Sequence, residues 1–321
     1  MNLFPVNCDY KIRLSKPHKQ GKGGWVMKRQ VGLSVWVGVM VVLGGIAAGI
    51  GLFAASGGEA YDFVNQYGDT IRMYGDGLYA NDSYFMAPIF RGTDFTILFL
   101  ATPLLVYAGV KDWLLPSAKT RLLLLSVISL FVYYSASLAF GVTYNELHLV
   151  YIGLLSASFY SLIMAVRSLN EVDLMKLTQA YAPTRGVYWF LALTGVALIV
   201  AWLPDIVQSW VNGRSLELIE VYTTSITYVL DMGIIAPAAW ICLVQLRKRK
   251  GMGVVLLAML LTVCCIVGIM LPIQSLFQGL AGIELPLAAV LSKVVSFVLL
   301  AAFALWFNVR LYRSLEQQAG A

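Results

Sequence analysis

Two ionisable residues, Asp231 and Lys293, lie well inside long apolar runs of the sequence. A charged side chain at the centre of a bilayer costs about 2.5–3.5 kcal/mol even on an insertion scale, so each residue should face the interior of a helix bundle or a water-filled cavity. At 1.5 Å per residue, both lie roughly 12–14 Å from the outer end of their run. We therefore predict an ion pair between Asp231 and Lys293.

Polar residues extend the helix faces that carry these two charges. Thr227 and Tyr228 share a face with Asp231, and Ser296 shares one with Lys293, because residues three and four apart are neighbours on a helix. One interpretation is a polar cavity that opens outward, in which the pair gates or couples the movement of protons or ions. The other is a structural pair that orients two helices.

A second polar group is expected at the outer ends of the helices, where it would form the mouth of the same site: Asp94 at the head of the second helix, Glu146, His148, Gln274 and Gln278. The alternative is that these residues are helix caps and solvated helix ends.

Other chemistry finds little support in the sequence. Only two histidines are present, His18 and His148, and the four cysteines have no CxxC spacing. There is no phosphate-binding glycine loop, HExxH pair or GxSxG motif. We therefore predict no metal, no cofactor and no nucleic-acid partner, and an intramembrane enzyme ranks behind the other functions.

The composition indicates that these residues belong to a membrane protein. Of 321 residues, 59% are hydrophobic and 12% are charged, against roughly 45–50% and about 25% in soluble domains. Continuous apolar runs long enough to cross a bilayer as helices predict an all-α polytopic bundle of about eight transmembrane helices. The runs are 31–56, 94–110, 122–140, 147–166, 187–203, 222–246, 254–272 and 285–307.

The basic residues predict the orientation of the bundle. Lys and Arg gather before residue 31 and in alternate connections at 111–121, 167–185, 247–250 and 310–313, whereas the other connections hold Arg72, Arg91 and Arg214. Because cytoplasmic loops carry the excess of Lys and Arg, both termini are expected in the cytoplasm of a bacterium, with the bundle in its inner membrane. The net charge of +6 reflects this topology.

The chain is expected to form one domain. Residues 27–313 form the bundle, 57–93 are an extracytoplasmic loop, and 314–321 are a short cytoplasmic tail. The basic leader 1–26 is either dispensable, with Met27 as the true start, or a disordered tail, and the first apolar run is a helix or a cleaved signal peptide. Loop 57–93 is either a ligand-binding cap or an interfacial segment rich in tyrosine. Gly45 and Gly49 form a GxxxG pattern that favours close helix packing, within the bundle or with a membrane partner or second copy.

Three short motifs make the chain similar to a group of bacterial multi-pass membrane proteins of unassigned function. The motifs are Asp94 with Pro103-Leu104-Leu105, Tyr144-Asn145-Glu146, and Leu230-Asp231-Met232-Gly233 with Pro237. The resemblance covers the chain from the second helix onward and implies a polytopic fold without implying an activity. Two functions stay open: transport of a small solute or ion through an outward-facing cavity, and a non-transporting membrane subunit or sensor in which the charge pair is structural.

Overall fold

The computed structural model describes residues 27–284 and 294–319. Within them, eight helices are long and apolar enough to cross a membrane, which confirms the predicted all-α polytopic bundle. The leader 1–26, the first part of the eighth apolar run and Lys293 lie outside the described residues. The ion pair between Asp231 and Lys293 therefore stays a prediction.

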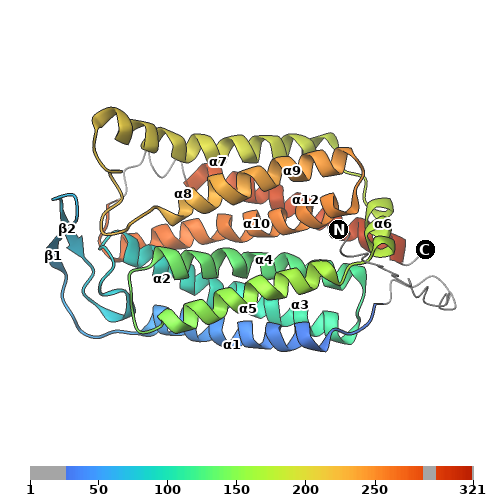
Figure 1. Ribbon diagram of the computed structural model, residues 1–321, viewed down its shortest axis with the longest axis horizontal. Coiled ribbons are helices and arrows are strands. Elements are labelled where there is room, and N and C mark those ends of the chain that lie inside the picture. The colour runs from blue at the N-terminus through green and yellow to red at the C-terminus, as the bar shows by residue number, and fades with distance from the viewer. Residues whose placement is uncertain (1–26, 285–293, 320–321) are drawn as a thin grey trace, which may run out of the picture.

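The spans follow the chain in order (Figure 1), and within the described residues two of them are interrupted by π-helical turns. They are α1 (Val31–Phe53); α2 (Met86–Thr96), which continues through the π turn Ile97–Ala101 into α3 (Thr102–Leu114); α4 (Ala118–Gly141); α5 (His148–Arg167); α7 (Arg185–Asn212); α8 (Ile226–Leu230), which continues through the π turn Asp231–Ile235 into α9 (Ala236–Arg247); α10 (Gly251–Leu280); and α12 (Ser296–Ala319).

Two small elements mark the opposite ends of the bundle (Figure 1). Strands β1 (Tyr61–Val64) and β2 (Thr70–Met73) pair antiparallel at one end, which we call the hairpin end. The short helix α6 (Glu171–Ala180) lies at the other, which we call the α6 end. The start of α1 and the end of α12 both lie at the α6 end, as an even number of spans requires.

Helices α4 and α10 form the centre of the bundle. In their most apolar stretches 72% and 67% of the residues are buried, whereas no other span exceeds 39%. The outer spans turn large apolar side chains such as Val42, Leu193 and Phe303 outward, as lipid-facing helices do. These faces are therefore expected to contact lipid rather than water.

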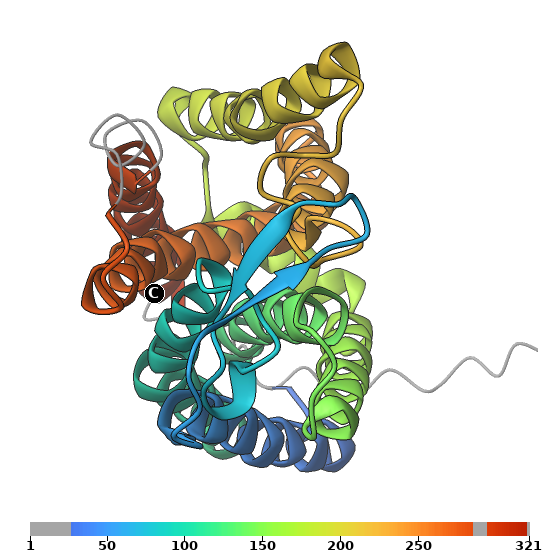
Figure 2. The same cartoon turned by 90° about the vertical axis from the view of Figure 1, so that its left-hand side faces the viewer.

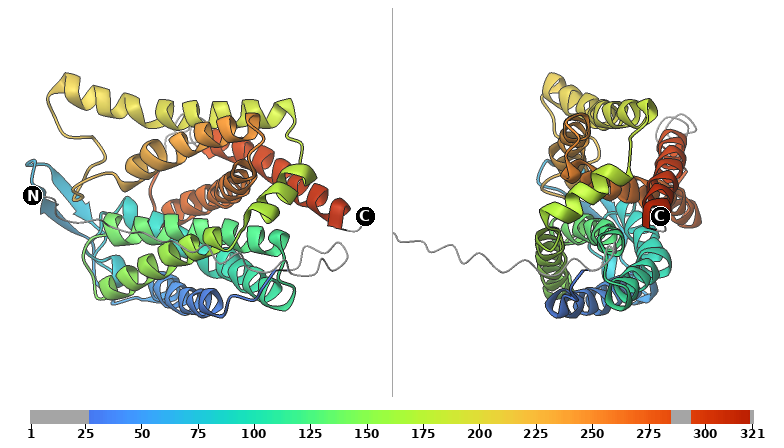
Figure 3. Two further views of the ribbon diagram at one scale, coloured as in Figure 1. Left: turned by 45° about the vertical axis from the view of Figure 1, so that its right-hand side comes forward. Right: turned by 90° about the vertical axis from the view of Figure 1, so that its right-hand side faces the viewer.

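The two halves of the chain pack differently around this centre. In the first half, α1 packs against both α2–α3 and α5, and α4 joins α3 to α5, so the four spans form a closed group. In the second half, α7 packs on α9 and α12 packs on α10, but α7 and α12 hardly meet. The end-on view shows this open arrangement, with α7 next to α9 and α12 next to α10 (Figure 2), and the two further views agree (Figure 3).

The interrupted spans share one local design. Each π turn is followed at once by a helix whose second residue is proline, Pro103 in α3 and Pro237 in α9. Proline has no N–H to donate to the preceding turn, and the π turn re-pairs the backbone there: Thr102 N–H bonds to the Ile97 carbonyl, and Ala236 N–H to the Asp231 carbonyl. Such π turns are frequent at functional sites.

Several boundaries differ from the sequence-based ones. The second span begins at Met86, eight residues before the predicted start at Asp94, because polar residues of this turn find partners inside the protein: Arg91 donates to Tyr74 Oη and to the Leu52 carbonyl. Loop 57–93 is correspondingly shorter. At the other terminus, α12 extends through most of the predicted tail 314–321, since Leu315 is fully buried.

The GxxxG pair on α1 faces away from the bundle. A Cβ added at Gly45 or Gly49 would meet no atom within 4 Å, whereas one at Gly44 would press on Phe131. Packing within the bundle therefore does not use Gly45 and Gly49. Association with a second copy or another membrane protein through this face stays a proposal.

Candidate functional site

Asp231 accepts hydrogen bonds from two neighbouring spans. The Tyr133 hydroxyl of α4 donates to Oδ1 at 3.0 Å, and the Trp202 indole N–H of α7 donates to Oδ2 at 3.0 Å. The side chain is 7% exposed. The first residue of a π turn thus presents a carboxyl group to α4 and α7 at once.

A cavity of about 870 Å³ opens at the hairpin end, and its lining includes Tyr228, one helical turn before Asp231 in the sequence. It lies between α7, α8, α10 and the linker that joins α7 to α8, and β1–β2 border it. Its polar lining residues in the described part of the chain are Asn65, Asp69, Asp205, Gln208, Ser209, Asn212, Arg214, Ser215, Glu217, Glu220, Tyr228, Gln274, Ser275 and Gln278. Four of these are carboxylates and one is a guanidinium, which pairs with Asp69, so the formal charge of the described lining is negative.

A stacked ring pair connects the cavity wall to Asp231. Tyr228 lines the cavity and donates its hydroxyl proton to the Asp205 carboxylate at 2.7 Å. The Tyr228 ring stacks on Trp202, with centroids 4.6 Å apart, and Trp202 in turn bonds to Asp231. The cavity wall at Tyr228 is thus connected to Asp231 through one ring contact and one hydrogen bond.

The structure brings together part of the predicted cavity group. Tyr228 lies on the cavity wall, and Thr227 beside it is half-buried. Ser296 is exposed at the first turn of α12. Lys293 is outside the described residues, so the described polar partners of Asp231 are Tyr133 and Trp202.

The residues of the predicted outer mouth lie in three separate places. Gln274 and Gln278 of α10 line the cavity and also bond to the second span, at Thr93 Oγ1 and the Phe85 carbonyl. Glu146 and His148 lie at the start of α5, away from the cavity, with Glu146 exposed. Asp94 does not head its helix; it is fully buried in α2.

Asp94 forms a second buried carboxyl site, against a different face of α4. Its oxygens accept hydrogen bonds from Tyr134 at 2.7 Å and from Tyr79 at 2.5 Å. Tyr134 follows Tyr133 directly, so adjacent tyrosines of the central helix α4 hold the carboxyl groups of the two interrupted spans. Gly51 of α1 closes this site, because an added Cβ there would lie 2.0 Å from Asp94 Oδ2.

No family model, curated protein or solved structure matches the chain. The site is therefore interpreted from its geometry.

Sequence reasoning did not single out Trp202 or Asp205. The predicted fifth run, 187–203, contained Trp202 only as one more apolar residue, and it ended before Pro204 and so left out Asp205. In the structure α7 continues through Pro204 to Asn212. The three-residue spacing of Trp202 and Asp205, which places both on one helix face, was the available signal.

A polar cluster fastens the linker between α7 and α8 to the cap formed by residues 60–84. The Tyr222 hydroxyl donates to Asp82 Oδ1 at 3.0 Å, Asn65 Nδ2 donates to the Glu220 carbonyl at 2.8 Å, and Ser83 Oγ bonds to the Glu220 carboxyl group. Burial raises the pKa of Asp82 to about 7, although hydrogen bonds from Thr143 and Tyr222 lower it. Burial also raises the pKa of Glu220.

We predict that the cap loses stability as the pH rises toward 7. A carboxyl group whose pKa is higher in the folded than in the unfolded state binds more protons when folded, so the stability that Asp82 contributes is full below about pH 4 and falls by ~1.4 kcal/mol per pH unit until about pH 7. The measurement is thermal unfolding in detergent from pH 5 to 8. As the pH rises, the thermal midpoint of Asp82→Asn should increase relative to that of the wild type.

The exposed Asp62 of β1 provides the matched control. Asp62→Asn should keep the wild-type pH profile, and Asp82→Asn/Glu220→Gln should have the flattest one, because burial raises the pKa of both cluster carboxyls. A wild-type slope in Asp82→Asn would show that another group governs this pH dependence.

Proposed function

We propose that the protein transports a small polar solute across the bacterial inner membrane, with the cavity as its outward-facing site and Asp231 as the residue that couples transport to protons or cations. One observation supports this most directly: the wall of the 870 Å³ cavity includes Tyr228, one helical turn along the chain from an intramembrane carboxyl group at a break in a spanning helix. Ionisable residues inside the membrane commonly mark ion and proton pathways.

Two features of the bundle agree with this proposal. Interrupted spans that place polar groups near the middle of the membrane are a common design of secondary transporters. The basic residues Lys119, Arg185 and Arg247 to Lys250 belong to the α6 end, so the positive-inside rule favours a cytoplasmic α6 end and an outward-facing cavity.

In the proposed mechanism, opening requires the Trp202 and Tyr228 rings to separate. The solute would then gain access to Asp231, which would release a proton or bind a cation as its hydrogen bonds with Trp202 and Tyr133 change. Asp205 sits on the cavity side of the same ring pair, through its hydrogen bond from Tyr228. The two carboxyl groups could thus act in sequence along one path.

The second candidate is a non-transporting membrane subunit or sensor. Its support is that both oxygens of Asp231 already accept hydrogen bonds and that Asp231 does not line the cavity. In that case Asp231 fixes the packing of α4, α7 and α9, and the cavity binds a ligand without passing it on.

A flux measurement separates these two functions. The full chain is reconstituted in liposomes containing a trapped pH-sensitive dye, and amino acids, amines and sugars are added outside one at a time. At least one should produce a proton flux, and Asp231→Asn should reduce this flux by about tenfold or more, equivalent to ~1.4 kcal/mol. Asparagine keeps hydrogen-bonding capacity and removes the charge, so the variant should fold.

Glu146→Gln is the matched control, because Glu146 is exposed at the same end of the bundle and lies outside the cavity. It should keep the wild-type flux. Unchanged flux in folded Asp231→Asn, or no response of the wild type to any compound, would favour the non-transporting subunit.

A further inference from the structure

A smaller cavity lies at the α6 end, on the outer side of the bundle. It has a volume of about 230 Å³ and lies between the first turns of α7 and the last turns of α9, two helices that pack along each other (Figure 1). Its lining residues are Arg185, Tyr188, Trp189, Ala192, Leu243 and Arg247. The charged residues of the lining are both arginines.

The two arginines leave their charge available to an external anion. In the described part of the chain neither Arg185 nor Arg247 has a carboxylate within ion-pair distance. Arg247 lies over the Tyr188 ring, 5.9 Å from its centroid, which holds the guanidinium beside the cavity. Arginine pairs are well suited to phosphate, because the planar guanidinium donates parallel hydrogen bonds to its oxygens.

From this cavity toward the middle of the membrane, the outer surface of α7 and α9 is apolar. On α7, Trp189, Leu193 and Val196 are 68%, 58% and 50% exposed, and on α9 Ile241 and Val244 are 52% and 46% exposed. Arg185 is the first residue of α7 and Arg247 the last of α9, so both guanidiniums lie at the ends of spanning helices, where we expect the lipid headgroups. The ligand that fits has an anionic head and long apolar chains.

We infer that this cavity binds an anionic glycerophospholipid, with its phosphate between Arg185 and Arg247 and its acyl chains along the outer faces of α7 and α9. The volume of 230 Å³ holds a phosphate and glycerol and leaves the chains outside, in the bilayer. Basic pockets between spanning helices on the cytoplasmic side are known to bind such headgroups. This inference does not depend on the transport proposal.

The test titrates phosphatidylglycerol into the full-length protein in detergent and counts bound lipids by native mass spectrometry, with phosphatidylcholine and inorganic phosphate as parallel probes. The wild type should bind phosphatidylglycerol in preference to phosphatidylcholine. Arg185→Gln/Arg247→Gln should weaken binding by about tenfold or more, since each basic residue near a membrane surface contributes several-fold.

Lys248→Gln/Arg249→Gln is the matched control, because it removes the same charge from neighbouring exposed positions that do not line the cavity. It should change the affinity less than twofold. Ala192→Phe tests the site by a second route, since the larger side chain fills the cavity without changing the charge and should also weaken binding.

Three results would overturn the inference. Equal loss of phosphatidylglycerol affinity in the two double variants would mean diffuse electrostatic attraction. Equal binding of phosphatidylcholine would show that the anionic headgroup plays no part. Full competition by inorganic phosphate would indicate a site for the free ion. Thermal unfolding without added lipid checks that all variants are folded.

Discussion

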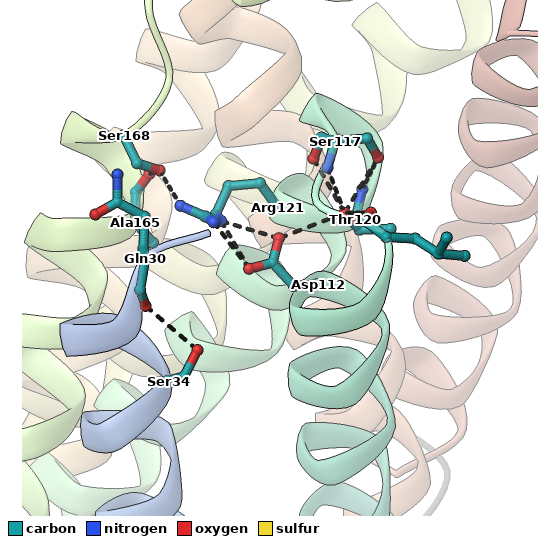
Figure 4. Close-up of polar contacts among 9 residues, drawn as sticks. Gln30, Ser34, Asp112, Ser117, Thr120, Arg121, Ala165 and Ser168 are labelled. Carbon is teal, nitrogen blue, oxygen red and sulfur yellow. Dashed lines mark hydrogen bonds and ion pairs between the residues drawn. The ribbon is translucent and has the colours of Figure 1, made fainter. Parts of the chain in front are cut away.

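Replacing Arg121 by methionine is expected to destabilise the protein by about 3–5 kcal/mol, because it leaves the buried carboxylate of Asp112 without its counter-charge. Arg121 is fully buried, and its Nε lies 3.0 Å from each oxygen of Asp112. Its Nη1 donates to Ser168 at 2.5 Å, so one side chain joins the ends of α3, α4 and α5 (Figure 4). Chemical or thermal unfolding in detergent measures the loss.

The double variant Asp112→Leu/Arg121→Met decides whether the loss comes from the uncompensated charge. Apolar replacement of both partners of a buried ion pair is often neutral or stabilising, so the double variant should recover most of the stability lost in either single one. Lys119→Gln is the surface control: its ion pair with Glu316 is partly exposed, and such pairs contribute about 0–1 kcal/mol. A double variant as unstable as Arg121→Met alone would argue against the charge explanation.

The second large effect is expected at Asp94. Asp94→Ala removes the acceptor of both the Tyr79 and the Tyr134 hydroxyl groups, which are buried. Each donor left without a partner costs about 1–3 kcal/mol, so the total loss is roughly 2–6 kcal/mol. Asp94→Asn should lose less, since the amide oxygen still accepts one hydrogen bond. Thermal unfolding and the yield of folded protein in detergent measure both variants.

Glycine substitutions on α1 test the same site from the opposite side. Gly51→Ala places a Cβ 2.0 Å from Asp94 Oδ2 and should destabilise the protein by about 1–3 kcal/mol through overpacking. Gly49→Ala on the same helix meets open space and should have little effect on the monomer. Equal effects of the two alanines would mean that helix propensity, rather than the Asp94 site, sets the response.

The adjacent tyrosines of α4 place the two carboxyl sites in different surroundings. Tyr134 bonds to Asp94 inside the closed first half of the bundle, whereas Tyr133 bonds to Asp231 in the open second half, one helical turn along the chain from Tyr228 of the cavity wall. We therefore expect substitutions at Asp94 to affect mainly stability. Substitutions at Asp231 are expected to affect mainly flux.

The sequence by itself determined the eight spans, because the bilayer requires about 20 apolar residues in each and leaves backbone groups to bond within their own helix. It also identified Asp231 as a buried functional candidate, since one carboxyl group in an apolar run is conspicuous without any knowledge of its neighbours.

Only the tertiary structure decided which groups meet. The partners of Asp231 are Tyr133 and Trp202, those of Asp94 are Tyr79 and Tyr134, and Asp82 bonds to Tyr222 across 140 positions of sequence. Hydrophobic periodicity fixes the length and approximate face of a helix but not the face of the neighbouring helix that packs against it. The physical reason is that helix contacts depend on rotation and axial shift, which the packing of all eight spans fixes together.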